Sequence, residues 1–184
     1  MRMNYAGFWK RLGAFAIDFL LMMPLIYLVI LGQSKFRYFD LYWALPGTVI
    51  GLWFSVYLVK RYGGTPGKLL LRTKVVMLDG SPVTWKAAML RYSIYLLFSL
   101  ASMLALGIGL LNLQIPDGQY FSMEFMARNA LIVGAAPSWH EVTIWLMQIW
   151  TWSEFLVILL NKKRRALHDY LAGTVVVNTL QTST

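Results

Sequence analysis

The segment FWKRLGAFAIDFLLMMPLIYLVIL, residues Phe8–Leu31, decides the fold, because it is apolar for the length of a bilayer and still contains a carboxylate. A helix needs about 20 apolar residues to cross the hydrocarbon core. A carboxylate there costs roughly 2.5–3.5 kcal/mol on insertion scales, so Asp18 must face protein or trapped water and needs a partner. Arg11 is a natural candidate, because seven residues are nearly two helical turns and place both side chains on one face.

The rest of the chain repeats this membrane pattern. Its 184 residues are 58% hydrophobic, and the mean hydropathy is +0.56. That composition lies outside the usual range of soluble domains, and the length suits one domain. We therefore predict an all-α membrane protein, a single domain over residues 1–184, with four transmembrane helices. They are expected at about residues 11–31, 42–60, 88–113 and 141–160.

The distribution of basic residues predicts how the helices are oriented. The net charge is +9, but the lysines and arginines stand at the ends of the apolar runs, which is typical of membrane topology and argues against nucleic acid as a partner. Fourteen of the 17 lie in the N-terminal segment, the loop between the second and third helices, and the C-terminal tail. Because basic loops stay inside, both termini are predicted to be cytoplasmic. This basic face would meet anionic lipid headgroups.

The loop between the second and third helices has internal order. Residues Leu69–Leu78 are β-prone or amphipathic, and the following Asp79-Gly80 is typical of a hairpin turn. We therefore expect a short cytoplasmic hairpin or an interfacial segment lying on the membrane.

The C-terminal tail is too short and too polar to span a bilayer. Residues Ala166–Thr179 predict a short helix, a stop at Gly173 and then a β-prone run. That run could pair with residues 74–76 of the second loop, on the cytoplasmic face.

The predicted outer loop, residues 114–140, is long for a compact protein. Within it, Ser122–Val133 fits a short amphipathic helix that turns Phe125 and Ile132 to the membrane.

Three blocks stand in order along nearly the whole chain: FWKRL at Phe8–Leu12 leading to Asp18, GTPGK at Gly64–Lys68 followed by Val75-Val76 and Asp79-Gly80, and RRALHDYLAGT at Arg164–Thr174. Together they resemble the RDD family of small bacterial membrane proteins, which is named for one arginine and two aspartates. The resemblance implies a triad of Arg11, Asp18 and Asp169 in a multi-pass protein of the bacterial cytoplasmic (inner) membrane. It also identifies residues 114–140 as an insertion relative to a minimal member. Most members have no assigned activity and some are linked to cation/proton exchange, so the resemblance informs the fold more than the function.

A second intramembrane acid, Glu154, lies at nearly the depth of Asp18. The two are about six and seven residues from the cytoplasmic ends of their helices, so both lie roughly 10 Å deep. Two carboxylates there could hold a cation or share one proton, and Asn161 continues the helix face of Glu154. The alternatives are a structural ion pair between Asp18 and Arg11, and a bond from Glu154 to a tyrosine or arginine across the bundle.

The pair His168-Asp169 stands next to the basic pair Arg164-Arg165. These residues could form the mouth of a proton relay, cap the tail against the bilayer, or lock the tail to the second loop. We prefer the lock, because basic partners surround Asp169. Two isolated histidines without cysteine do not make a metal-ligand set, and no phosphate loop or nucleophile–base pair stands out. We therefore expect no metal, no cofactor and no enzymatic activity.

These patterns lead to a transport hypothesis and a structural rival. Asp18 would bind a proton or a monovalent cation, Arg11 would position it, and Glu154 would assist. Four helices are few for a carrier, so we expect a homo-oligomer or a membrane partner. In the rival, the protein is a non-transporting scaffold or assembly partner whose charged triad staples the fold. A third, weaker option is a lipid-handling protein that uses the basic face.

Overall fold

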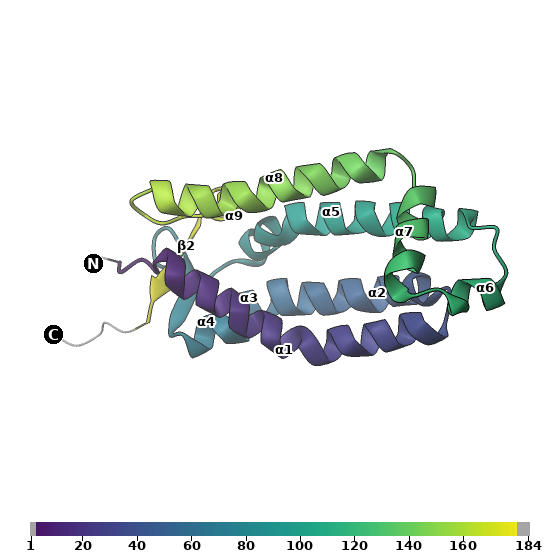
Figure 1. The fold of residues 1–184 in the computed structure, drawn as a ribbon. Coiled ribbons are helices and arrows are strands. Elements are labelled where there is room, and N and C mark those ends of the chain that lie inside the picture. The colour runs from purple at the N-terminus through teal and green to yellow at the C-terminus, as the bar shows by residue number, and fades with distance from the viewer. Residues whose placement is uncertain (1–2, 180–184) are drawn as a thin grey trace. The chain divides into compact units, whose positions relative to one another are not determined.

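The computed structural model describes residues 3–179 and consists mainly of helices (Figure 1). Four helical segments of this described part are long and apolar enough to cross a membrane. They are α1 (Phe8–Lys35), the second span (Phe39–Leu70), α5 (Trp85–Asn112) and α8 (Trp139–Leu160). The predicted all-α fold with four spans is confirmed, and each span begins two or three residues before its predicted start.

The second span is assembled from several pieces. It starts as α2 (Phe39–Leu52), widens into the π-helix η1 (Trp53–Tyr57) and continues as α3 (Leu58–Tyr62). Gly63 then ends α3 with a φ of +81°, which only glycine adopts without strain. The one-turn helix α4 (Pro66–Leu70) follows, with proline at its first position, where a missing N–H costs nothing.

The described chain divides into two compact units. Unit 1 contains residues 3–22, 49–94 and 149–179, and unit 2 contains residues 23–48 and 95–148. All predicted site residues belong to unit 1.

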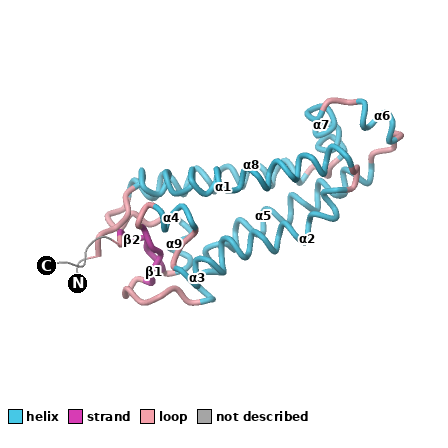
Figure 2. The backbone as a smooth tube through the Cα atoms, turned by 90° about the horizontal axis from the view of Figure 1, so that it is seen from below, coloured by secondary structure: helices cyan, strands magenta, loops and turns pink. Residues whose placement is uncertain are grey.

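A two-stranded antiparallel sheet lies in unit 1 (Figure 2, magenta). Strand β1 (Thr73–Met77) pairs with β2 (Thr174–Asn178), and Val75 lies opposite Val176. Tyr5 adds an isolated bridge to Val177 of β2, on the edge opposite β1. The predicted pairing of the tail with the second loop is thereby confirmed.

Of the hairpin predicted for the second loop, only a tight turn after β1 forms. Gly80 has a φ of +86°, and the Met77 N–H donates to the Ser81 carbonyl at 2.9 Å. The returning arm makes one isolated bridge, between Val76 and Pro82. Proline has no N–H, so this arm cannot extend the ladder. The valine-rich tail supplies the strand instead, and it buries its side chains in doing so.

The tail forms the three parts that its pattern predicts. It folds into α9 (Leu167–Ala172), stops at Gly173 with a φ of +65°, and enters β2 directly. Glycine adopts this left-handed conformation at low cost, which lets the chain reverse within one residue.

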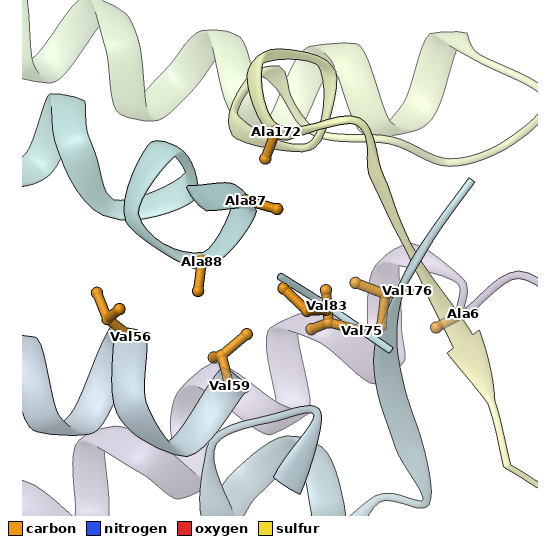
Figure 3. Packing of buried hydrophobic residues seen from close by; sticks show 9 residues of the cluster. All are labelled: Ala6, Val56, Val59, Val75, Val83, Ala87, Ala88, Ala172 and Val176. Atoms are coloured by element: carbon orange, nitrogen blue, oxygen red, sulfur yellow. The ribbon is translucent and has the colours of Figure 1, made fainter. Parts of the chain in front are cut away.

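The core of unit 1 joins these elements (Figure 3). Small and β-branched side chains fill it. They come from the segment before α1, from η1, α3 and β1, from the loop before α5 and the start of α5, and from α9 and β2. They are Ala6, Val56, Val59, Val75, Val83, Ala87, Ala88, Ala172 and Val176. Because small side chains let backbones approach closely, this core fixes the positions of the charged residues around it.

Unit 2 contains the predicted insertion, which folds into α6 (Asp117–Ser122) and α7 (Phe125–Ala135). Helix α7 confirms the predicted short helix but corrects its orientation. Ile132 was expected to face the membrane, yet it is buried against Leu110 and Tyr120. An apolar side chain gains as much from a protein contact as from lipid, so amphipathicity alone did not decide its partner.

Two arginines hold this insertion. Arg37 donates to the carbonyl oxygens of Leu113 and Ile115, both at 2.6 Å, and to Asp117 at 2.8 Å. The guanidinium groups of Arg37 and Arg128 both lie over the Tyr120 ring. Charged hydrogen bonds to backbone carbonyls and cation–π contacts therefore order the loop.

Candidate functional site

The centre of the site is Asp169, the third residue of α9, whose side chain is 0% exposed. Its carboxylate accepts hydrogen bonds from Arg11 of α1 at 2.8 Å and from Arg91 of α5. It also accepts from the Thr174 hydroxyl of β2 and from the Ala166 backbone N–H, each at 3.0 Å. One carboxylate thus caps its own helix and ties α9 to α1, α5 and β2.

The charge state of Asp169 follows from these contacts. Burial by itself would raise the pKa of the carboxyl, but the positive charges of Arg91 and Arg11 and the neighbouring His168 outweigh it and hold the pKa well below its usual range. Asp169 therefore stays ionised at any physiological pH, and it is unsuited to carry a proton.

Asp18 has different partners from the one predicted. Its Oδ2 accepts from the Thr65 hydroxyl at 2.5 Å, and its Oδ1 accepts from the Gly67 N–H at 2.7 Å. Arg11, the expected partner, bonds to Asp169. Seven residues along a helix are separated by about 10 Å, so a shared face does not bring Arg11 and Asp18 into contact.

The turn before α4 fits closely against α1 because residue 67 is glycine. A Cβ at this position would overlap the Ala14 carbonyl oxygen and come within 2.9 Å of the Asp18 carboxyl. The small residue lets its N–H reach Asp18 directly. Next to it, the Lys68 ammonium donates to the Thr65 hydroxyl at 3.3 Å.

The second intramembrane acid, Glu154 of α8, bonds to α9. Both of its carboxyl oxygens lie 2.7 Å from Nδ1 of His168. On the other side of the ring, Nε2 lies 2.9 Å from Nη2 of Arg91. Since arginine can only donate, Nε2 must accept, and the ring hydrogen is on Nδ1, which donates to Glu154. His168 thus links Glu154 of α8 to Arg91 of α5 through the two nitrogens of its ring.

These contacts form a connected polar chain through unit 1: Glu154, His168, Arg91, Asp169 and Arg11. Glu154 and Asp18 are held by separate elements, so the predicted pocket shared by the two acids stays a prediction. This series of polar contacts includes Arg11 and Asp169, two residues of the triad that the family resemblance implies. The third, Asp18, is bonded to the turn at residues 65–67 instead.

Comparison with protein families agrees with this arrangement. The model of the RDD family matches residues 5–173, which is most of the chain and includes Arg11, Asp18, Glu154 and Asp169. The chain belongs to the RDD family. No curated protein and no solved structure matches it. Together with its four apolar helices, the family identifies a multi-pass membrane protein.

Asn161 and Arg165 connect α8 to α9 in this RDD protein. Asn161 accepts from the Arg165 N–H at 2.8 Å and donates to the Arg165 carbonyl at 2.7 Å, which closes the linker into a loop. Arg165 donates to the carbonyl oxygens of Asp169 and Thr174 and stacks on Tyr170. These contacts fit the preferred interpretation of the tail as a lock, with its ties made within the tail and through Asp169.

Sequence reasoning missed two residues of the RDD site. Arg91 was counted among the basic residues of the second loop and as part of a polar stripe on the third helix, with no partner named, although it is 8% exposed and bonds to both Asp169 and His168. Thr65 was part of a recognised block without a role, although it is the hydroxyl donor to Asp18. One signal was available for Arg91, because it lies on the same helical stripe as Tyr95, Ser99 and Ser102.

The described residues contain no group of three or more His, Asp or Glu side chains placed to hold a metal ion. Chemically, the site offers one charged cluster around Asp169, one carboxylate bonded to neutral donors, and one histidine between an acid and an arginine.

Proposed function

We propose that this RDD protein exchanges protons for a small monovalent cation across its membrane, and that Asp18 binds the proton or the cation in turn. One observation carries the proposal. Asp18 is a 9% exposed carboxylate on a spanning helix, and its hydrogen-bond donors are a hydroxyl and a backbone N–H, both neutral. Among the described residues, no ion pair joins it to a basic side chain.

The energetic argument rests on the absence of a direct ion pair to Asp18 among the described residues. A buried carboxylate is costly unless it is paired, so an unpaired one favours binding of a proton or a cation. An ion pair with Arg11 would weaken the binding of a proton or cation by Asp18, but Arg11 is paired with Asp169. The ammonium of Lys68 bonds to the Thr65 hydroxyl, and its charge acts on Asp18 through space without a direct hydrogen bond. Asp18 is therefore the carboxylate of unit 1 best suited to alternate between two ligands.

The other charged residues take supporting roles in this proposal. Glu154 and His168 form a hydrogen-bonded acid–imidazole pair, which suits the transfer of a proton at the end of α8. Arg11, Asp169, Arg165 and Asn161 hold the surrounding elements. In this proposal the end with both termini and the second loop faces the cytoplasm of a bacterial cell across its inner membrane, and the basic residues of these segments support that orientation. A homo-oligomer would complete the path, and the protein would be a carrier and not an enzyme.

The test is ion-driven proton movement in proteoliposomes that contain the full chain. An inward gradient of Na⁺, K⁺ or Li⁺ should move protons in the wild type, and Asp18→Asn should reduce this movement to the level of empty liposomes. Asp79→Asn is the matched control, because Asp79 is an exposed acid that bonds only to its neighbour Ser81 in the turn. A folded wild type without cation-dependent proton movement would reject the exchange proposal.

The second candidate is a membrane scaffold or assembly partner, and the Asp169 cluster favours it. The fully buried carboxylate of Asp169 accepts hydrogen bonds from two arginines, a hydroxyl and a backbone N–H, as expected for a residue that holds the fold together. A scaffold predicts that Asp18→Asn lowers abundance in the membrane. Exchange predicts normal abundance with lost proton movement, so the same variant separates the two candidates.

A further inference from the structure

An apolar groove lies on the surface of unit 1, between the second span and α5. Its volume is about 370 Å³, which falls in the range of ligand pockets. No charged side chain lines it. The lining residues are Val49, Leu52, Trp53, Val56, Tyr57, Trp85 and Met89.

The groove forms at the π-helix η1. A π turn holds an extra residue and displaces the side chains around it, and such turns occur often at functional sites. Three of the lining residues, Trp53, Val56 and Tyr57, belong to η1. On the facing side, α5 contributes alanines to the core beneath, where Ala87 and Ala88 pack with Val56 (Figure 3). The groove therefore has two structural causes: the π turn widens the second span, and the small side chains of α5 do not fill the space beside it.

One end of the groove is aromatic and basic. The rings of Tyr57 and Trp85 approach to 6.3 Å between centroids, and both residues are of the kinds enriched where a membrane meets water. Arg61 lies one helical turn beyond Tyr57, and Lys60 lies one turn beyond Val56. Lys86 precedes Met89 by one turn at the start of α5.

The other end is entirely apolar. From Tyr57 the groove follows the second span back to Val49, a rise of about 12 Å along the helix. The wall is therefore hydrocarbon-like along its length and positively charged at one mouth, which is the pattern of a molecule with an acyl chain and an anionic head.

We propose that this groove is a binding site for an anionic diacyl phospholipid, with one acyl chain along η1 and the phosphate at Lys60, Arg61 and Lys86. An ordinary lipid-facing helix surface contacts acyl chains without regard to the headgroup. Here three basic residues lie one helical turn from residues that line the groove, so a negative headgroup would be selected over a zwitterionic one. The inference is independent of whether the protein exchanges ions.

The test measures lipid retention by native mass spectrometry on the full chain purified in detergent, titrated with phosphatidylglycerol or with phosphatidylcholine of the same acyl chains. Phosphatidylglycerol should bind at least about tenfold more tightly, since three basic side chains each favour an anionic headgroup. Neutralising Lys60, Arg61 and Lys86 together to glutamine should remove that preference. Neutralising Lys162 and Lys163, which lie in the exposed turn after α8, should leave it within about twofold.

A second variant tests the acyl chain independently of charge. Val49→Phe narrows the apolar end and should reduce retention of both lipids, while the elution volume and helical content of the protein stay those of the wild type. Equal affinity for the two lipids in the wild type would overturn the proposal. So would unchanged lipid retention in Val49→Phe. A wild-type dimer that Val49→Phe converts to a monomer, without any change in bound lipid, would assign the groove to a second copy of this chain and overturn the lipid proposal.

Discussion

Asp169 and Asp18 are both carboxylates buried in unit 1, yet they are neutralised in different ways. Asp169 is 0% exposed and faces two guanidinium groups. Asp18 is 9% exposed and faces a hydroxyl and a backbone N–H. Burial alone therefore does not determine how a buried acid is neutralised. What distinguishes them is whether the charge is compensated by fixed charges of the protein.

The comparison also separates the family's named residues into two groups. Arg11 and Asp169 form one ion pair, although they are 158 positions apart in the chain. Asp18 lies outside that pair and is bonded to the turn that begins α4. In the proposed function, one aspartate ties the fold and the other binds the ligand.

The largest expected effect is that of Asp169→Asn on stability. The change leaves Arg11 and Arg91 buried without their counter-charge, and breaking a buried pair in this way typically costs about 3–5 kcal/mol. Denaturation of the detergent-solubilised protein, followed by circular dichroism, measures the free energy of unfolding. Asp79→Asn serves as the control and should change it by no more than about 0.5 kcal/mol. A loss below about 1 kcal/mol in Asp169→Asn would show that the cluster does not tie the fold.

A smaller effect is expected for Thr65→Val, which removes the hydroxyl that donates to Asp18. A hydrogen bond to a charged group contributes about 1.5–3 kcal/mol, and Thr65 is 5% exposed, so water cannot readily replace it. Thr65→Ser keeps the hydroxyl and should retain most of the stability. If Thr65→Val and Thr65→Ser unfold at the same denaturant concentration, the loss comes from packing and not from the bond to Asp18.

The smallest expected effect is that of mild acid on the Asp169 cluster. The pKa of this carboxyl is lowered in the folded protein, chiefly by Arg91, against the effect of its burial. Its contribution to stability is therefore complete above the unfolded pKa of about 3.9 and is lost only as the pH falls below it. The difference in unfolding free energy between wild type and Asp169→Asn should be the same at pH 7 and pH 5, and it should shrink at pH 3. A difference that already disappears at pH 5 would contradict the assigned charge state.

The fold was largely predictable because its signals are local. Apolar runs of bilayer length located the four spans, and Gly173 before a valine-rich run located the end of α9 and the start of β2. The pairing of that run with β1 was also anticipated, because both segments flank spans that end on the same side. The expected hairpin was reduced to a turn by a single residue, Pro82, which cannot donate to a ladder.

The site was predicted less completely than the fold. The sequence identified Asp18, Glu154 and Asp169 as acids that need partners, and helical spacing indicated the face on which Asp18 lies. It did not identify the partners. Spacing suggested Arg11 for Asp18, but the rise of a helix keeps residues seven apart out of contact, and the nearest donors come from a turn far along the chain.

The sequence by itself thus determined that the protein crosses a membrane four times, which elements flank the spans, and which charged residues must be compensated. These properties depend on hydropathy, on helix length and on glycine and proline, and each is set within a few turns of the chain. Only the tertiary structure decided that Arg11 and Arg91 neutralise Asp169, that His168 joins Glu154, and that Thr65 and Gly67 bind Asp18. A side chain's partner depends on which distant segments the packed core brings within hydrogen-bond distance, and no local pattern records that distance.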